Sequence, residues 1–168
     1  MIPIMNKKSW LIGMLCVLVL GEALVYFSYE HNKISSKNYL ATVQPQQSAV
    51  VINNAKVFVT RAVTAAEVTK GLSGTPNLPT DHGMLFIFKS ADHYRFWMPD
   101  MNFPLDIIWI GADRKVVDIS KNVPPLADKT KPVYYRPIVP AKYVLEVNAG
   151  WSDAHGIAPG EDAQFLSI

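Results

Sequence analysis

The sequence predicts a mainly β domain, either an antiparallel β-sandwich or a partly closed barrel, with one or two short helices. An N-terminal transmembrane or signal helix is expected to precede this domain. About seven to nine short runs have strand length, many prolines separate them, and one segment has convincing helix signals. Strand–helix–strand units do not alternate along the chain, so a parallel sheet covered by helices is not expected.

Composition narrows the class of protein. The 168 residues are enough for one domain and a tail, and 49% of them are hydrophobic, which allows a sizeable core. The net charge is +2, without a basic run or stripe, so we expect no nucleic-acid partner. The single cysteine, Cys16, lies in the N-terminal apolar stretch, which leaves the rest of the chain without a disulfide or a thiolate.

The N-terminal region is expected to export the rest of the chain. Residues 10–27 are apolar apart from Glu22, and Lys7 and Lys8 precede them. A helix of this length spans about 27 Å, close to the hydrocarbon thickness of a bilayer. Either this helix is an uncleaved anchor that contacts the membrane through residues 10–27, or it is a signal peptide cleaved near Ala23. The domain is then anchored in the inner membrane, facing the periplasm or the exterior, or it is secreted into the periplasm.

Three segments follow from this interpretation. Residues 1–29 are the signal peptide or signal anchor, and residues 30–48 are a polar linker without an apolar period. Residues 49–168 form the β domain. Its first predicted feature is a hairpin, because Asn53 and Asn54 lie between two β-rich runs and adopt positive φ angles easily.

A short helix and a strong strand come next. Thr64 and Glu67 have the spacing of a capping box, and Gly71 is expected to end the helix. A loop rich in proline and glycine leads to residues 83–88, a continuous apolar run of strand length. A strand that is apolar on both faces lies between two layers.

The centre of the chain combines a turn with a second strong strand. Pro99 and Pro104 restrict the residue before each of them to extended conformations, so the chain turns between them. Residues 105–110 form the strand, and alternation places Asp106 on the same face as the apolar residues two and four positions later. A hairpin turn leads into residues 116–120.

The last third of the domain starts irregularly. Residues 122–140 are rich in proline, and residues 143–148 then alternate as a strand. Tyr143, Leu145 and Val147 lie on one face of this strand, and Val144, Glu146 and Asn148 lie on the other. A short strand over residues 161–166 closes the fold.

Five blocks of sequence follow one another in an order and spacing that resemble the DUF192 family over about residues 49–168. These blocks are Lys70-Gly71-Leu72, Gly83-Met84-Leu85-Phe86, Phe96-Trp97-Met98, Pro104-Leu105-Asp106-Ile107-Ile108 and Tyr143-Val144-Leu145-Glu146-Val147-Asn148-Ala149-Gly150. The resemblance implies a compact β-rich domain, often behind an export signal, whose biochemical role is unassigned. In two places the chain departs from the family pattern. Ser73-Gly74-Thr75 stands where members usually have a methionine and an arginine, and Met98-Pro99-Asp100 replaces a Met-X-Asn block.

Two carboxylates are the catalytic candidates, Asp106 and Glu146. A pair of acids can act as general acid and base when their environments separate the two pKa values. The alternative is structural: Asp106 accepts backbone N–H groups after the preceding turn, and Glu146 lies on a solvated face. No nucleophile–base motif is present, so we lean towards a domain that is not an enzyme and has no cofactor.

Imidazole and thioether groups gather near Trp97, and such soft ligands suit Cu(I). The metal candidates are His82, Met84, His93, Met98 and Met101. The alternative interpretation is that these methionines fill the core and the histidines lie at the surface.

Aromatic residues indicate a third kind of site, a cleft for a small ligand. The candidate pocket is built by Trp97, Met98, Asp106, Glu146 and Trp151, of which Trp151 lies in a polar setting and is expected to be exposed. Our leading hypothesis is an exported or membrane-anchored domain that binds a small ligand or an envelope protein without catalysis. The alternatives are an envelope hydrolase using Asp106 and Glu146, and a Cu(I)-binding protein using histidine and methionine.

Overall fold

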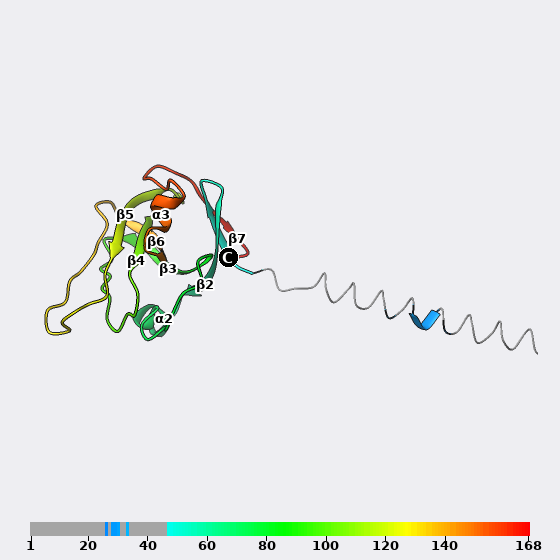
Figure 1. Ribbon diagram of the computed structural model, residues 1–168. Helices are drawn as coiled ribbons and strands as arrows, with labels where there is room; N and C mark the ends of the chain where they lie inside the picture. Colours follow the sequence, from blue (N-terminus) through cyan, green and yellow to red (C-terminus); the bar gives the residue numbers. More distant parts are fainter. Residues whose placement is uncertain (1–25, 27, 31–32, 34–46) are drawn as a thin grey trace, which may run out of the picture. The chain divides into compact units, whose positions relative to one another are not determined.

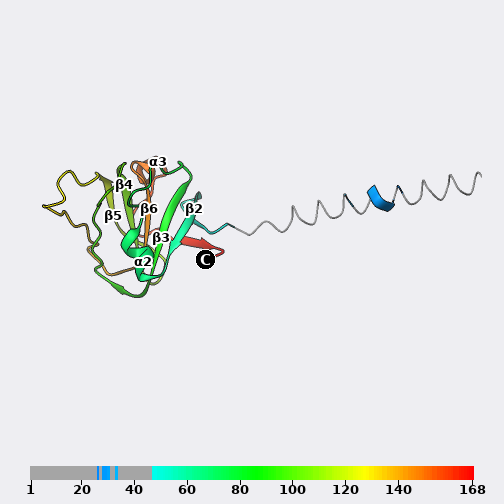
Figure 2. The ribbon, with the colours of Figure 1, turned by 90° about the horizontal axis from the view of Figure 1, so that it is seen from below.

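Seven strands form one curled sheet in the order β5-β4-β6-β3-β2-β1-β7 (Figure 1). The elements are β1 (Ala49–Ile52), β2 (Ala55–Ala62), α2 (Ala65–Lys70), β3 (His82–Asp92), β4 (Leu105–Ile110), β5 (Val116–Val123), β6 (Ala141–Asn148), α3 (Trp151–Ala154) and β7 (Ala163–Leu166). The two short helices lie at opposite ends of the sheet, as the two views agree (Figures 1 and 2). The mainly β class is therefore confirmed, and both helices are short.

This computed structural model describes residues 26, 28–30, 33 and 47–168. The chain divides into two compact units, residues 1–45 and residues 46–168, and the named strands all belong to the second. The described residues of the first unit are helical. Nearly all of the predicted anchor or signal helix over residues 10–27 lies outside the described residues. Within the described part of the chain, no helix has the length and apolar character needed to span a bilayer.

Local signals shape the first elements as the sequence predicts. Asn53 and Asn54 have φ angles of 48° and 64°, and they join β1 and β2 in an antiparallel hairpin. Thr64 and Glu67 form a reciprocal capping box at the start of α2. Gly71, with φ of 48°, ends the helix. Each of these features depends on neighbouring residues only, which explains why the sequence predicts them.

The pairing of β2 with β3 differs from the expected antiparallel arrangement. These two strands run parallel, with Val59 opposite Gly83. Between them, α2 and the loop after it return the chain to the end of the sheet at which β2 begins, so β3 starts beside the first half of β2. The other pairs of strands are antiparallel.

Over residues 47–168 the strands form one sheet and not the two sheets of a sandwich. This sheet bends until its two edges approach each other. Lys115, just before β5, forms a β-bridge with Asp162, just before β7. The backbone N–H of Val116 donates to the carbonyl oxygen of Glu161 at 2.9 Å, and that of Gly160 donates to the carbonyl oxygen of Val116 at 2.8 Å. Of the two predicted architectures, the partly closed barrel is the one that forms.

Strand alternation divides the buried residues between the two faces of this curled sheet. The inner cluster receives buried side chains from all seven strands, among them Leu85, Ile108 and Leu145. The outer cluster contains buried side chains on the other face, among them Phe86 and Trp109. Apolar residues outside the sheet, from α2 and from the segments around residues 94–103 and 126–135, pack against this outer cluster.

Asp106 is a fully buried charged group that ties three segments together. Its Oδ1 accepts the backbone N–H groups of Asn122 at 2.9 Å and Gly150 at 3.2 Å, and its Oδ2 accepts that of Ser152 at 2.9 Å. The carboxylate therefore joins β4 to the end of β5 and to the start of α3. This arrangement matches the structural alternative for Asp106.

We expect Asp106→Ala to lower the free energy of unfolding by about 1–3 kcal/mol, because buried N–H donors lose their acceptor. Urea unfolding of the full chain measures this change. Asp162→Ala is the matched control, since that carboxylate is exposed and its partner among the described residues is the exposed Lys115. Equal stability of the wild type and Asp106→Ala would show that the carboxylate is not structural.

Candidate functional site

A segment that we call the strap, residues 95–101, crosses the outer face of the sheet between β3 and β4. Hydrogen bonds hold it on one side, where Phe96 and Tyr135 exchange backbone bonds of 2.8 Å. On the other side, the Ser73 hydroxyl donates to the Pro99 carbonyl oxygen at 2.7 Å, and the Gly74 N–H donates to the Asp100 carbonyl oxygen at 2.9 Å. The strap is therefore fixed at both edges.

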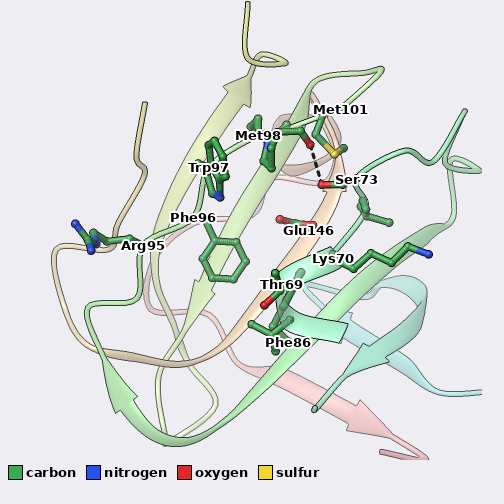
Figure 3. Close-up of a pocket in the computed structure, with 14 residues that line it drawn as sticks. Thr69, Lys70, Ser73, Phe86, Arg95, Phe96, Trp97, Met98, Met101 and Glu146 are labelled. Atoms are coloured by element: carbon green, nitrogen blue, oxygen red, sulfur yellow. Dashed lines mark hydrogen bonds between the residues drawn. The ribbon is translucent and has the colours of Figure 1, made fainter. Parts of the chain in front are cut away.

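A cavity of about 250 Å³ lies between the strap, the end of α2 and the sheet (Figure 3). Its lining comes from residues 68–73, from Phe86 of β3, from residues 95–99 and Met101 of the strap, and from Glu146 of β6. Most of these side chains are apolar or aromatic. The sheet supplies the floor and the strap and α2 supply the walls.

Glu146 is the acidic group of this floor. Strand β6 lies between β3 and β4, and Glu146 is opposite Met84 on one side and Ile107 on the other. Only 5% of the residue is exposed, and its carboxyl group points into the cavity (Figure 3). Within the described part of the chain, this carboxyl makes no hydrogen bond or ion pair with the protein.

Burial without a partner changes the chemistry of this acid. Removal from water raises the pKa of Glu146 to about 8, because the charged form is poorly solvated there. At neutral pH the carboxyl therefore carries a proton as long as no positive charge lies beside it. It can donate a hydrogen bond in that state, or it can ionise if a positive charge is brought next to it.

The two bases of the lining do not face this acid. The side chains of Lys70 and Arg95 both point away from Glu146 (Figure 3). The Arg95 guanidinium instead lies over the ring of Tyr134, 5.2 Å from its centroid. Trp97 is 41% exposed, and its ring lies 6.1 Å from that of Tyr134, so aromatic surface reaches the solvent beside the cavity.

Comparison with known proteins identifies the fold. The model of the DUF192 family, described as "Uncharacterized ACR", matches residues 48–165. The chain belongs to the DUF192 family. Two crystal structures are similar to this DUF192 protein. One is a protein from Sinorhizobium meliloti 1021, provisionally named a transcription regulator, with 26% identity, 73% of this chain and 95% of that chain covered, and a TM-score of 0.65.

The other similar structure is a protein of unknown function from Novosphingobium aromaticivorans DSM 12444. It is 31% identical, the match covers 73% of this chain and 88% of that chain, and the TM-score is 0.64. Among curated proteins, none matches the DUF192 chain significantly.

The structure brings together three of the residues that the sequence nominates for ligand binding: Trp97, Met98 and Glu146. It does not bring Asp106 or Trp151 to this cavity, because both lie on the inner side of the sheet. The prediction that Trp151 is exposed is wrong, because the residue is only 6% exposed and packs in the inner cluster. The polar residues around it in the sequence lie at the barrel's end, whereas its indole enters the core.

Strand geometry contradicts the hypothesis that Asp106 and Glu146 act together as a catalytic pair. Asp106 is opposite Val147, and Glu146 is opposite Ile107, so the two carboxylates belong to consecutive positions of the ladder. Consecutive positions point to opposite faces of a sheet. Asp106 therefore lies inside the barrel and Glu146 outside it, and they share no cleft. The expectation that Glu146 lies on a solvated face is also wrong, since the strap covers that face.

The copper candidates do not meet at one site. His82 opens β3 and lies 2.7 Å from the Asp81 carboxylate, whereas His93 follows the other end of that strand, with Nδ1 3.0 Å from the Pro137 carbonyl oxygen. The two histidines therefore lie at opposite ends of an eleven-residue strand. Met98 and Met101 line the cavity, and Met84 packs at the edge of the outer cluster. The described residues contain no group of three or more His, Cys, Asp or Glu side chains arranged for a metal.

Sequence reasoning missed several members of the site, notably Leu72, Ser73, Phe86 and Arg95. A signal was present for most of the lining. Four of the five blocks that carry the DUF192 resemblance contribute residues to this cavity, and the fifth contains Asp106. The blocks are far apart in the sequence, so only the folded chain shows that they meet.

We expect the free energy of unfolding to fall as pH rises from about 5 to about 8, relative to the variant Glu146→Gln. In this window the unfolded chain releases the Glu146 proton, since its ordinary pKa is 4.5, whereas the folded chain keeps it up to about 8. The unfolded state therefore binds fewer protons, and stability decreases by up to about 1.4 kcal/mol per pH unit. Urea unfolding of both proteins at several pH values measures the difference, and parallel pH profiles would contradict a raised pKa.

Proposed function

We propose that this DUF192 domain is a non-catalytic module that binds a small ligand in the cavity under the strap, with Glu146 as its polar anchor. The observation that carries the proposal is a glutamate, Glu146, that is only 5% exposed, whose carboxyl group points into a cavity and has no partner in the described part of the protein. A buried polar group without a partner costs about 1–3 kcal/mol. A ligand that supplies the missing partner recovers part of that cost.

The character of the lining supports binding of a small molecule. Ligand sites are concave and mostly apolar, with a few polar groups that fix orientation. The cavity of about 250 Å³ is slightly below the range of roughly 300–1,000 Å³ that is common for drug-sized ligands. The ligand should therefore be small, with an apolar part that contacts Phe86, Phe96 and Trp97.

Binding without catalysis is favoured because Glu146 has no second reactive group beside it in the described lining. The Ser73 hydroxyl donates to the Pro99 carbonyl oxygen, and Lys70 and Arg95 point away. A general acid that acts on a bound substrate needs a nucleophile or a base as its counterpart.

A blocked cavity tests this proposal. Ligand-observed NMR with a library of fragments of about ten non-hydrogen atoms should detect binding to the full chain. Thr69→Trp should abolish that binding, because this exposed threonine lines the cavity and an indole would fill it. Thr80→Trp is the matched control, since Thr80 is exposed but does not line the cavity. Equal fragment binding to both variants, or none to the wild type, would refute the proposed pocket.

We further propose that the domain acts in the cell envelope. The support is the apolar stretch over residues 10–27 after Lys7 and Lys8, which would anchor the domain or be cleaved after export. We propose no nucleic-acid partner, although the Sinorhizobium protein was provisionally named a transcription regulator, because the net charge is only +2 and no basic stripe is present in the sequence.

Export is tested with a reporter that is active only outside the cytoplasm, fused after Ile168. The full chain should give an active reporter, and deletion of residues 1–29 should abolish the activity while leaving the amount of fusion protein similar. An active reporter after the deletion would contradict an N-terminal export signal, and so would an inactive reporter on the full chain.

A further inference from the structure

The cavity under the strap has one acidic side chain in its described lining, Glu146 at the floor, and the side chains of its two basic residues, Lys70 and Arg95, point away from it. From this arrangement we propose that its ligand is a small organic cation, an amine that carries an apolar group. The inference rests on the function proposed above and names the ligand class for the same site. The ammonium would lie against the Glu146 carboxylate, and the apolar group would contact the strap.

The charges around Glu146 favour a cation over an anion. Lys70 and Arg95 are the charged residues of the described lining besides Glu146, and their side chains point away from it (Figure 3). Arg95 is engaged with Tyr134. An anionic ligand at the floor would find neither base and would meet a carboxyl group, whereas a cation would meet an acid with no competing partner.

Among the described elements packed around Glu146, no other titratable group faces it. Its neighbours across the ladder, Met84 on β3 and Ile107 on β4, do not titrate. Asp100, at the far end of the strap, pairs with Lys129 and is not part of the lining. The protonation of Glu146 therefore depends mainly on its burial and on what occupies the cavity.

The apolar lining also suits a cation. The rings of Phe86, Phe96 and Trp97 border the cavity, and Phe86 and Phe96 are fixed edge to face at 4.8 Å. Aromatic faces attract organic cations through the negative charge of their π systems. Met98 and Met101 add polarizable thioethers that adapt to the shape of an apolar group. The walls can therefore contact both the ammonium group and the apolar group of such a ligand.

Binding of a cation must release a proton. Burial raises the pKa of Glu146 to about 8, so the carboxyl is protonated at neutral pH before a cation binds. The ammonium pairs with the ionised form, and the Glu146 proton therefore passes to the solvent as the cation enters. The balance is one proton released for each cation bound, provided that the amine stays protonated. The affinity for the cation therefore rises with pH until the pH approaches 8, the pKa of Glu146.

The test compares benzylammonium with benzyl alcohol, which has nearly the same shape but no charge. Isothermal titration uses the full chain in two buffers that differ in ionisation enthalpy, between about pH 6 and about pH 7.5. We expect benzylammonium to bind at least about tenfold more tightly than benzyl alcohol at the upper pH. Close to one proton should be released for each benzylammonium bound, and the affinity for benzylammonium should rise nearly tenfold per pH unit.

Two variants test whether the preference for the cation and its pH dependence come from Glu146. Glu146→Gln should weaken benzylammonium binding by about tenfold or more and remove its pH dependence, while benzyl alcohol binding changes by less than about twofold. Glu161→Gln, a glutamate outside the lining, should leave both unchanged. Thermal unfolding of each variant confirms that it is folded.

The possible failures are distinguishable. If benzyl alcohol binds as tightly as benzylammonium, or if Glu146→Gln binds the cation like the wild type, the cation inference is overturned and the pocket is retained. If neither probe binds while neutral fragments do, the ligand class is again wrong. If neither probe nor any fragment binds, the proposed function fails as well.

Discussion

The alternation of side chains along β6, enclosed by β3 and β4, is the constraint on which the site depends. Leu145 and Val147 enter the barrel, so Val144 and Glu146 must face the outside. Because strands flank β6 on both sides, Glu146 cannot swing past an edge into water. A small residue supports this packing: a Cβ added at Gly83 would lie 2.6 Å from the Glu146 carbonyl oxygen. The close contact of β3 with β6 therefore fixes the floor of the cavity.

The strap converts an outer sheet face into a site. An apolar face such as that of Phe86 and Trp109 needs a cover, and α2 and the strap supply it. Their cover is incomplete above Glu146, where about 250 Å³ stays open. Burial of an unpartnered acid lowers stability above its ordinary pKa, and an apolar residue would avoid this cost. A ligand that pairs with the acid gives a physical reason for the glutamate.

Two carboxylates on adjacent strands have opposite roles for a reason that is not local. Asp106 accepts N–H groups from Asn122, Gly150 and Ser152, which come from segments far along the chain. Glu146 finds no such donor in the described part of the protein, and it faces the cavity instead. Both residues lie in strands that are rich in apolar residues. Only the partners that the fold supplies make one a structural tie and the other a candidate site.

The sequence by itself determined the features that neighbouring residues control. These are the Asn53-Asn54 hairpin, the capping box of α2, the alternation that places Asp106 and Glu146 on defined faces, and the mainly β class. The five family blocks also carried a specific resemblance. Each of these depends on turn chemistry, capping or strand period over a few residues.

Tertiary structure alone decided the parallel pairing of β2 with β3, the closure of the barrel near Lys115 and Asp162, and the burial of Trp151. It also decided that the strap covers Glu146, so that a residue expected at the surface lies at the floor of a cavity. These outcomes depend on contacts between segments that are distant in sequence. Local pattern carries no information about such contacts, because the same alternating strand can face solvent, a core or a covering loop.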